Sequence, residues 1–425
     1  METVSSQVEV MAEESDVLVI GGGAVGVCTA YYLAQKGCRV TLIEKGEICS
    51  GCSYGNACMI VPSHAMPVPA PGVIGKSLKW MFQEDSPLLI RPRADWQLLL
   101  WLLRFAASCR RRPMERAIPV LRDLGRASLH LFRELSTSEG LSFDFEQRGL
   151  MSVYTTAAGL EEGREEADIM ARHGLDLQVL SGDRARELEP ALNRRVVGAL
   201  CSAEDAHGNS HRFVTGLGET LGRHGVAVRT GTAMTGWLLE GGRPSGVRTE
   251  RGDFRAPEIV LAMGSWTPLL ARELGVRVPV QAGKGYSLTM DRPALSPRIP
   301  LIHAERKVAV TPIGDRLRFA GTMEFAGIDL SLNPTRTEAI RRGAVEVLSG
   351  VDNTANAERW CGLRPCTPDG LPIIDRLPRH PHLYLSTGHA MLGYTHGPIS
   401  GKLMAELVCG EPTSLPLEPL SLGRF

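Results

Sequence analysis

The stretch Asp16-Val-Leu-Val-Ile20-Gly21-Gly22-Gly23-Ala24-Val25-Gly26 decides the fold of this chain. A short β-branched run leads into a Gly-x-Gly-x-x-Gly turn, and a helix is predicted over 27–36. A second strand is predicted over 39–43, and Glu44 stands at its end, eighteen positions after Gly26. This order of strand, glycine turn, helix, strand and acidic residue predicts a dinucleotide-binding βαβ unit.

Each residue of this turn has a separate task in such a unit. Gly21 allows the tight turn, Gly23 lets the backbone approach a pyrophosphate, and Gly26 lets helix and strand pack closely. The amides and the positive dipole end of the helix then face the diphosphate. Glu44 is expected to accept hydrogen bonds from the adenosine ribose hydroxyls and to repel a 2′-phosphate, which disfavours NADP.

The placement of further motifs favours FAD over NAD, although both cofactors use the same turn. A Gly- and Ser-rich segment, Ser50-Gly-Cys-Ser-Tyr-Gly-Asn-Ala57, follows Glu44 closely, and a flavin buried along its length needs such a second backbone approach. A late strand over 258–262 runs into the turn Gly264-Ser-Trp266, which is suited to close over the nucleotide. An NAD-linked dehydrogenase stays open as an alternative at this point.

Length, charge and cysteine usage limit the class of protein. The chain has 425 residues with 43% hydrophobic and 22% charged residues, which excludes disordered, collagen-like and coiled-coil classes. The 47 basic residues balance the 47 acidic ones, so no nucleic-acid partner is expected. Residues 1–15 carry acidic but no basic side chains, unlike a signal peptide, and we expect a flexible extension of a cytoplasmic protein.

The ten cysteines are interpreted as reduced thiols. Cys49, Cys52 and Cys58 cluster, but no fourth thiol stands at a suitable spacing. No zinc or iron–sulfur site is therefore predicted.

The other elements place the chain in the α/β (α+β) class. Helices are predicted over 77–109, 114–139 and 157–173. Short strands are predicted over 150–154, 226–230, 258–262, 285–290, 307–311 and 316–321.

One predicted helix has large apolar residues and a cationic end. It reads Trp96-Gln-Leu-Leu-Leu-Trp101-Leu-Leu-Arg-Phe105 and is followed by Arg110-Arg111-Arg112. Two interpretations stay open: a buried helix with a solvated basic turn, or a surface helix that touches lipid headgroups.

The segment Cys361-Gly-Leu-Arg364-Pro-Cys-Thr-Pro-Asp369-Gly places one arginine in a rigid turn. Such an arginine can clamp a carboxylate with two hydrogen bonds, and a surface salt bridge is the alternative. A strand over 382–386 and the turn 387–398 then lead into a helix through Leu407. The start of that helix could face a flavin pyrimidine ring and stabilise its anionic reduced form.

Several motifs recur in a fixed order along the chain and carry a family resemblance. After the glycine turn come Ile43-Glu44-Lys45, Ser53-Tyr-Gly-Asn-Ala57, Ala70-Pro-Gly72 with Lys79-Trp80-Met-Phe82, Lys284-Gly-Tyr-Ser-Leu-Thr289, Gly362-Leu-Arg-Pro365 with Thr367-Pro-Asp-Gly370, and Thr387-Gly-His389 with Leu392-Gly393. From Asp16 to about Val408 the chain resembles the FAD-dependent D-amino-acid dehydrogenases of the D-amino-acid oxidase, glycine oxidase and sarcosine oxidase superfamily.

The resemblance implies two domains. A Rossmann-like FAD-binding domain is accompanied by a discontinuous substrate domain, built on an antiparallel sheet plus helices. The FAD-binding domain is expected to comprise 16–65, 206–235, 255–272 and 355–425. The substrate domain is expected to comprise 66–205, 236–254 and 273–354.

The resemblance also implies a reaction with non-covalent FAD. A D-amino acid, with D-proline or a hydroxy-D-proline as candidates, is oxidised by hydride transfer from its α-carbon to flavin N5. Water hydrolyses the imine to a 2-oxo acid, and a quinone or another acceptor that is not oxygen takes the electrons. The helix over 96–112 is then a candidate surface for peripheral contact with the inner face of the cell membrane. Alternatives are a flavoprotein subunit of a heteromeric amine dehydrogenase, or a glycine- or sarcosine-type oxidase.

Site residues follow from the matching positions of the family. Arg364 stands where related oxidases hold the substrate carboxylate, and Tyr286 or Tyr54 could supply the second carboxylate contact. His389 could influence amine deprotonation or be structural. The predicted cofactor contacts are Gly21, Gly23, Ala24, Val25, Gly26, Glu44, Lys45, Ser53, Asn56, Ala57, Val228, Ala262, Gly264, Trp266, Gly362, Gly388, Met391, Leu392, Gly393, Tyr394 and Thr395.

The chain departs from two branches of the superfamily. Glycine oxidases have an arginine where Met391 stands and tyrosines before the strand over 307–311, which argues against a glycine oxidase. Sarcosine oxidases tether flavin through a cysteine near the Gly362 position, and Cys361 is adjacent, but covalent attachment is not expected.

Overall fold

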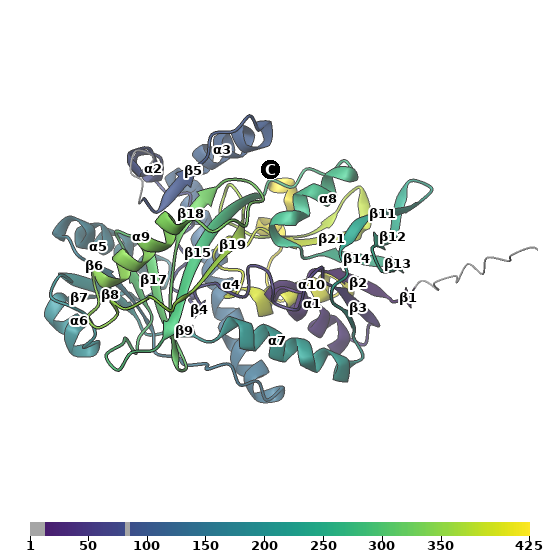
Figure 1. The fold of residues 1–425 in the computed structure, drawn as a ribbon. Helices are drawn as coiled ribbons and strands as arrows, with labels where there is room; N and C mark the ends of the chain where they lie inside the picture. The colour runs from purple at the N-terminus through teal and green to yellow at the C-terminus, as the bar shows by residue number, and fades with distance from the viewer. Residues whose placement is uncertain (1–12, 81–85) are drawn as a thin grey trace, which may run out of the picture.

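The computed structural model describes residues 13–80 and 86–425, and two large sheets organise it (Figure 1). Residues 1–12 of the predicted N-terminal extension lie outside the described part. Met81 and Phe82 of the Lys79-Trp80-Met-Phe82 motif lie outside it as well. The predicted α/β (α+β) class is confirmed, because strands and helices alternate along the chain and the strands form both parallel and antiparallel sheets.

The first large sheet has the strand order β10-β3-β2-β14-β21-β20 and is parallel except for β20. Its strands are β2 (Val17–Ile20), β3 (Val40–Ile43), β10 (Ala227–Arg229), β14 (Glu258–Leu261), β20 (Ile373–Leu377) and β21 (His380–Thr387). β2 is buried at every position, as expected for a parallel strand covered on both faces. The predicted βαβ opening is confirmed, since α1 (Ala24–Gln35) connects β2 with the adjacent β3.

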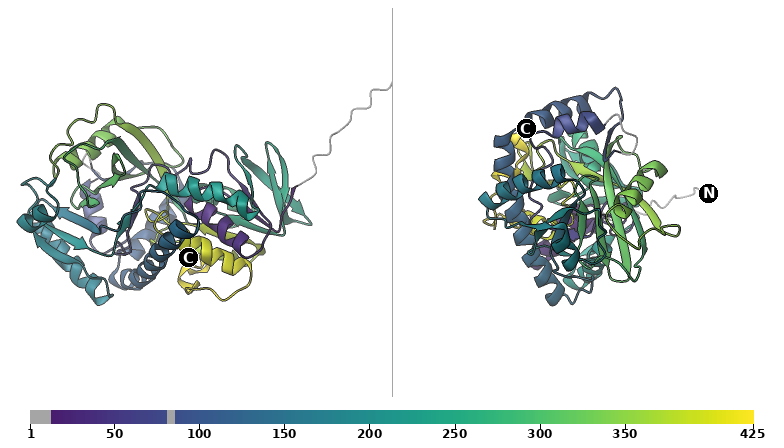
Figure 2. Two further views of the ribbon diagram at one scale, coloured as in Figure 1. Left: turned by 90° about the horizontal axis from the view of Figure 1, so that it is seen from below. Right: turned by 90° about the vertical axis from the view of Figure 1, so that its left-hand side faces the viewer.

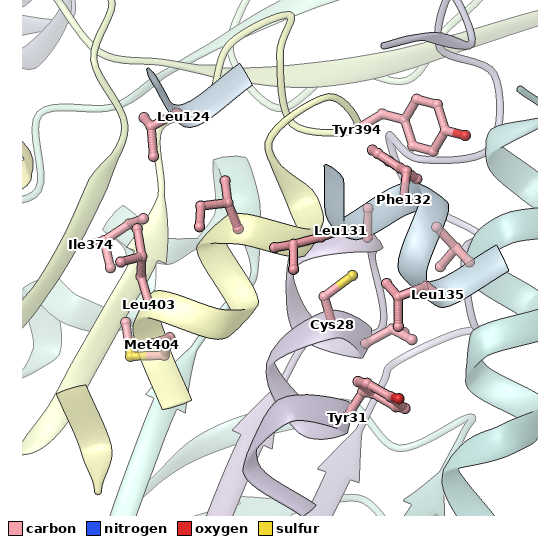
Figure 3. Packing of buried hydrophobic residues seen from close by; sticks show 14 of the residues in the cluster. Cys28, Tyr31, Leu124, Leu131, Phe132, Leu135, Ile374, Tyr394, Leu403 and Met404 are labelled. Atoms are coloured by element: carbon pink, nitrogen blue, oxygen red, sulfur yellow. The ribbon is translucent and has the colours of Figure 1, made fainter. Parts of the chain in front are cut away.

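Four helices share one hydrophobic core beside this sheet: α1, α4 (Arg111–Ser138), α7 (Ser210–Thr220) and α10 (Gly397–Val408). Figure 3 shows Cys28 of α1, Phe132 of α4 and Leu403 of α10 within this core. α4 therefore packs with the helices of the six-stranded sheet, although residues 66–205 were expected in the substrate domain. Its apolar stripe predicts a buried face but carries no information about which sheet covers that face.

The opposite face of the six-stranded sheet is covered by a small sheet and a helix. The small sheet has the order β1-β13-β12-β11, and its strands are β1 (Glu13–Glu14), β11 (Met234–Glu240), β12 (Arg243–Thr249) and β13 (Gly252–Arg255). Trp237 and Phe254 pack with Leu18 and with α8 (Thr267–Glu273) in a second core. Residues 236–254 thus pack on the six-stranded sheet and not on the sheet expected for the substrate domain.

The second large sheet has the order β19-β15-β18-β17-β16-β6-β8-β7, with β5 paired to β18. Its strands are β5 (Leu88–Ile90), β6 (Leu150–Tyr154), β7 (Gln178–Ser181), β8 (Gly198–Ser202), β15 (Gln281–Asp291), β16 (Leu301–His303), β17 (Val308–Ile313), β18 (Arg316–Phe325) and β19 (Glu358–Cys366). Only the β16–β6 and β18–β5 pairs are parallel among these described strands. Figure 2 shows the two large sheets at opposite ends of the molecule.

The smaller elements of the described chain complete the fold. They are α5 (Ala157–Arg172), α6 (Gly182–Leu188), α9 (Pro334–Val345), β4 (Met59–Ile60), β9 (Ala206–His207), η1 (Leu221–His224), η2 (Gly264–Trp266), η3 (Glu418–Leu420) and η4 (Leu422–Arg424). In the described residues no helix combines the length and the apolar character needed to cross a membrane.

The single helix predicted over 77–109 is wrong. The segment contains α2 (Val73–Trp80), strand β5 and α3 (Trp96–Ser108). Pro87 and Pro92 flank β5, and proline removes a backbone donor and clashes with the preceding helical turn. The helix predicted over 157–173 is confirmed as α5, and the strand predicted over 150–154 as β6.

Candidate functional site

The glycine turn between β2 and α1 has no room for larger residues. Gly21 has a φ of +115°, and a Cβ on it would lie 2.6 Å from the carbonyl oxygen of Ala262. A Cβ on Gly26 would lie 1.8 Å from the carbonyl oxygen of Gly21. The tight turn and the close helix–strand packing expected from the sequence are therefore both present.

The first turn of α1 is suited to an anionic group. It contains no acidic residue, and its N-cap Gly23 has no side chain to satisfy the helical amides. The hydroxyl of Ser53 accepts a hydrogen bond of 2.9 Å from the amide of Ala24. Within residues 13–80 and 86–425, the amides of Val25 and Gly26 have no hydrogen-bond acceptor. A diphosphate at this helix start would receive these free donors and the positive end of the helix dipole, so the residues fit the diphosphate of FAD.

Glu44 is held at the end of β3 by backbone amides. Its carboxylate accepts hydrogen bonds from Gly22 N at 2.7 Å and Gly46 N at 2.9 Å. The Nζ atom of the neighbouring Lys45 lies 3.6 Å from the ring centre of Trp266, which belongs to η2 (Gly264–Trp266). The structure thus brings three predicted cofactor contacts together along the same edge of the parallel sheet.

The loop 53–58 connects this edge to the second large sheet. Arg318 of β18 donates hydrogen bonds to the carbonyl oxygens of Tyr54 at 3.0 Å and Asn56 at 3.1 Å. Thr311 of β17 donates to the carbonyl oxygen of Ala57 at 2.7 Å. Arg318 was not predictable from the sequence, because an arginine at an inward position of a strand has no local signature. The loop is therefore fixed at both sheets.

Arg364 lies on strand β19 and not in the rigid turn that its Gly and Pro neighbours predicted, because residues 358–366 pair with β15 along their whole length. It is a partly buried cation. It stands opposite Gly283 of β15, and a Cβ on Gly285 would lie 1.9 Å from its guanidinium. Its Nη1 donates to the carbonyl oxygen of Thr322 at 2.7 Å, and within the described chain it forms no ion pair. Burial lowers the pKa of this guanidinium from its ordinary value. A carboxylate ligand would supply the missing negative charge.

Side chains on one face of β19 and β15 surround this arginine. Trp360, Gly362 and Arg364 alternate along β19, and Trp360 stands opposite Ser287. A Cβ on Gly362 would lie 2.1 Å from the indole of Trp360, and a Cβ on Gly55 would lie 2.2 Å from it. The buried hydroxyl of Ser287 has no hydrogen-bond partner in the described structure. Trp360 and Ser287 were missed because only the strand pairing places them on the same face of the sheet as Arg364.

Tyr286 does not reach this face. It stands opposite Cys361, one position out of phase with Arg364, so its side chain lies on the other face of the sheet. Its hydroxyl donates to Glu324 at 2.7 Å, and burial together with this carboxylate raises the pKa of Tyr286. Tyr286 therefore cannot supply the second carboxylate contact next to Arg364.

Tyr54 lies on the correct side but its hydroxyl is engaged. The hydroxyl donates to Glu358 at 2.8 Å, and the ring lies 5.0 Å from His211 and 6.3 Å from Trp360 between ring centres. Tyr54 thus belongs to the wall around Trp360. A contact with a substrate carboxylate would require its hydroxyl to leave Glu358.

His389 is buried and bonded within the protein. Its Nε2 lies 2.8 Å from the hydroxyl of Ser400 in α10, and burial lowers the pKa of His389 to about 4. The imidazole is therefore neutral near pH 7. The following residue, Ala390, donates its amide to the carbonyl oxygen of Pro365 at 2.8 Å, which joins this turn to the Arg364 strand. The structural interpretation of His389 is the one that these contacts favour.

The remaining predicted cofactor contacts divide into two groups. Met391 is 44% exposed, next to the turn that joins the Arg364 strand. Tyr394 instead lies in the core, with its ring 5.1 Å from that of Phe132 (Figure 3), and the hydroxyl of Thr395 donates to the carbonyl oxygen of Met59 at 3.0 Å. The side chains of Tyr394 and Thr395 therefore point away from the cofactor edge, and only their backbone could contact a cofactor.

Other predicted contacts lie at the ends of parallel strands. Val228 pairs with Leu42 in the sheet, and Gly264 accepts a hydrogen bond of 3.0 Å from the hydroxyl of Thr387. Gly388 has a φ of +81°, which favours glycine. No group of three potential metal ligands occurs in the residues that the structure describes.

Comparison with known proteins gives one family. The family model described as FAD dependent oxidoreductase (DAO) matches residues 16–407. The D-amino acid dehydrogenase of Paramagnetospirillum magneticum is 37% identical over 416 residues, covering 96% of this chain and 98% of that protein. The D-amino acid dehydrogenase of Xanthobacter autotrophicus is 33% identical over 416 residues, covering 96% of this chain and 99% of that protein.

Solved structures agree with this fold. Glycine oxidase from Geobacillus kaustophilus superposes with a TM-score of 0.79 at 22% identity, covering 97% of this chain and all of that chain. L-proline dehydrogenase from P. horikoshii superposes with a TM-score of 0.74 at 20% identity, covering 98% of each chain. The matched family model spans nearly the whole described chain, and the helix start of α1 fits its cofactor. The chain therefore belongs to the DAO family of FAD-dependent oxidoreductases.

Proposed function

We propose that this enzyme oxidises a D-amino acid to its imine, which water hydrolyses to a 2-oxo acid and ammonia. The proposal is supported by the relatives named D-amino acid dehydrogenase, which are 32 to 37% identical over nearly their full length. FAD, when bound, supplies the two-electron acceptor for this oxidation. The residues of the chain bind and orient the substrate and the cofactor.

The FAD diphosphate is held at the start of α1, between Gly23 and Gly26, and the ribose at Glu44. Segments 16–65, 206–235, 255–272 and 355–425 were expected to form the FAD-binding part, but β19 (Glu358–Cys366) within the last of them pairs with β15 in the second large sheet and is assigned to the substrate side. Segments 66–205, 236–254 and 273–354 were expected on the substrate side, but α4 and 236–254 pack around the six-stranded sheet. These two segments are accordingly moved to the FAD-binding part.

Arg364 is the observation that carries the proposal. It is a partly buried guanidinium without an ion pair in the described residues, on the same face of the sheet as the unbonded hydroxyl of Ser287. We assign Arg364 to the substrate carboxylate and Ser287 to an additional hydrogen bond to the substrate. Fixing the carboxylate orients the α-hydrogen towards the cofactor, so orientation supplies much of the rate. His389 is not the base, because its neutral ring is bonded to Ser400.

The side chain of the substrate lies between Trp360 and Met391 in this proposal. Trp360 is a flat apolar wall against Gly362, and Met391 is partly exposed and unbranched. Such a wall suits a compact or cyclic side chain, and D-proline or a hydroxy-D-proline is the substrate that we propose to test first. For these substrates the imine is cyclic, so water opens the ring to an amino-2-oxo acid and no ammonia is released.

The electrons leave to a quinone or another acceptor that is not oxygen. This part of the proposal rests on the name dehydrogenase carried by the relatives. We propose that the enzyme works in the cytoplasm, at the inner face of the cell membrane.

Anaerobic mixing of the FAD-loaded protein with single amino acids tests the proposal. The panel contains D-amino acids, D-proline, hydroxy-D-prolines, glycine and sarcosine, with the L-enantiomers as matched controls. Loss of oxidised flavin absorbance with the D-forms alone is the expected result. Absorbance that persists across the panel would contradict the proposal and favour a subunit that is active only in a complex.

A further inference from the structure

Strand β18 carries one extra residue where it pairs with β15. The register between the two strands shifts by one residue between Lys284 and Tyr286. Gly285 therefore stands opposite two residues of β18, Thr322 and Met323. Such an insertion is a β-bulge, which bends its strand and changes the direction of the neighbouring side chains. We call Thr322 and Met323 the β18 bulge.

Thr322 adopts a strained backbone conformation in this bulge. Its φ is +64°, and among the described non-glycine residues with a positive φ it is the only β-branched one. In bulges that need a left-handed residue this position normally holds glycine, because a branched side chain crowds the backbone there. Such strain persists only where the surrounding structure holds it, and it concentrates at ligand-binding sites. The conformation of Thr322 therefore points to a task in the site.

The carbonyl group of Thr322 holds the guanidinium of Arg364. Nη1 of Arg364 donates to this carbonyl oxygen at 2.7 Å, and Nη2 lies 3.5 Å from the carbonyl oxygen of Gly321. The guanidinium fills the space that a side chain on Gly285 would need, since a Cβ there would lie 1.9 Å from Nη1 and 2.3 Å from Nη2. Arg364 is thus fixed between the β18 bulge and the bare backbone of Gly285. A planar fork that is fixed on one side presents its other donors in a set direction.

The bulge also decides on which face of the sheet Glu324 lies. Ala320 stands opposite Ser287, so its side chain lies on the same face as Arg364. Under strict alternation Glu324, four positions later, would lie on that face as well. The extra residue moves Glu324 to the opposite face, where its carboxylate accepts a hydrogen bond of 2.7 Å from Tyr286. Without the bulge, a carboxylate of the protein would share a face with Arg364.

Met323 moves in the reverse direction. A Cβ on Gly283 would lie 2.3 Å from Sδ of Met323, and Gly283 stands opposite Arg364. The bulge therefore places a thioether on the face from which it removes the carboxylate of Glu324. The guanidinium has no countercharge within the described chain, so the carboxylate of a ligand is the partner that it lacks.

We propose that Thr322 is a positioning residue for the substrate carboxylate. Its left-handed backbone directs its carbonyl at Arg364, and its insertion into β18 keeps Glu324 off the face on which Arg364 lies. The guanidinium then meets a carboxylate already oriented and without a competitor from the protein, so binding loses less conformational freedom. This inference deepens the proposed function and rests on it, because Arg364 binds the substrate carboxylate there.

Two variants displace the guanidinium and leave Arg364 in the chain. Thr322→Pro fixes φ at about −65°, which excludes the conformation of the bulge. Gly285→Ala places a Cβ where the guanidinium lies. Because a displacement of about 1 Å can cost about 10²-fold in rate, we expect kcat/KM to fall by about 10²-fold in both, with most of the change in KM. Thr322→Gly keeps the left-handed backbone and the carbonyl, so it should bind the substrate like the wild type.

Binding of propionate to the full-length, FAD-loaded enzyme gives a second measurement that needs no turnover. Propionate carries the carboxylate alone, its Kd follows from the change in flavin absorbance, and the uncharged propionamide is the control ligand. We expect the Kd for propionate to rise by about tenfold or more in Thr322→Pro and Gly285→Ala, and to stay at the wild-type value in Thr322→Gly. Gly236→Ala is the matched control variant, because Gly236 lies on β11 and a Cβ on it would meet no atom within 4 Å.

An unchanged KM and an unchanged Kd for propionate in Thr322→Pro or Gly285→Ala would overturn the proposal. So would a loss of propionate binding in Thr322→Gly, because the side chain itself would then be the active part. Thermal unfolding and flavin content show which variants fold, and if Thr322→Pro does not, the opposite results expected for Gly285→Ala and Thr322→Gly still test the proposal. A wild-type flavin that no D-amino acid reduces contradicts the proposed function, whereas normal reduction with an unchanged KM in the variants contradicts only the role of Thr322.

Discussion

Replacing Arg364 by methionine should weaken substrate binding far more than cofactor binding. The methionine fills a similar volume but removes the partly buried positive charge. A hydrogen bond to a charged group contributes roughly 1.5–3 kcal/mol. Two such bonds to one carboxylate contribute about 3 to 6 kcal/mol. Since each 1.4 kcal/mol is a factor of ten, we expect a fall in kcat/KM of about 10²- to 10⁴-fold.

The assay is steady-state oxidation with an artificial acceptor, and flavin absorbance reports the FAD content of each variant. Lysine at position 364 should restore little, because it lacks the planar fork that binds a carboxylate twice. Arg359→Ala is the matched control, since Arg359 is exposed on the same strand and on its opposite face. A KM that is unchanged in Arg364→Met would refute the assignment of the carboxylate.

Three further outcomes are expected. Gly26→Ala should abolish FAD binding, because its Cβ would lie 1.8 Å from the carbonyl oxygen of Gly21. Flavin absorbance after purification measures the bound FAD. Gly222→Ala is the control, since its Cβ would have open space and this variant should bind FAD normally. Tyr286→Phe should lower the free energy of unfolding by about 1–3 kcal/mol in a urea titration, because the buried Glu324 carboxylate loses the donor at Oε2 and keeps only its ion pairs at Oε1, chiefly with Arg91. A changed KM would contradict the position of Tyr286. Burial lowers the pKa of His389 to about 4, so on acidification the unfolded chain binds this proton before the folded chain does. The free energy of unfolding should therefore fall as the pH falls from about 6.5 to about 4. His389→Asn should weaken that fall in thermal unfolding and leave the pH profile of kcat/KM above pH 7 unchanged.

The parts of the site that were predictable are encoded over short distances in the chain. The turn Gly21–Gly26 and Glu44 are set by local backbone requirements, so their spacing is informative without a structure. Arg364 was identified by its rigid Gly and Pro neighbours and by the family resemblance. In each case the residues that explain the function lie within one βαβ unit or one motif.

The parts that were not predictable depend on pairing between distant strands. Whether Tyr286 shares a face with Arg364 is decided by a register difference of one residue between β15 and β19. Arg318 and Ser287 gain their meaning only from loops and strands far away in sequence. The proline-flanked strand β5 was missed because three residues give too short a pattern to separate it from the helices on either side.

The course of the chain through the two large sheets has a consequence for how such enzymes can be recombined. The chain builds β2 and β3, leaves to build β5 to β8, returns for β10 and β14, leaves again for β15 to β19, and returns for β20 and β21. No single cut separates the strands of one sheet from those of the other. A new substrate preference therefore cannot be acquired by exchanging one contiguous gene segment, as in modular proteins. It has to arise by point substitutions, or by exchange of several segments whose junctions all lie between the same two sheets.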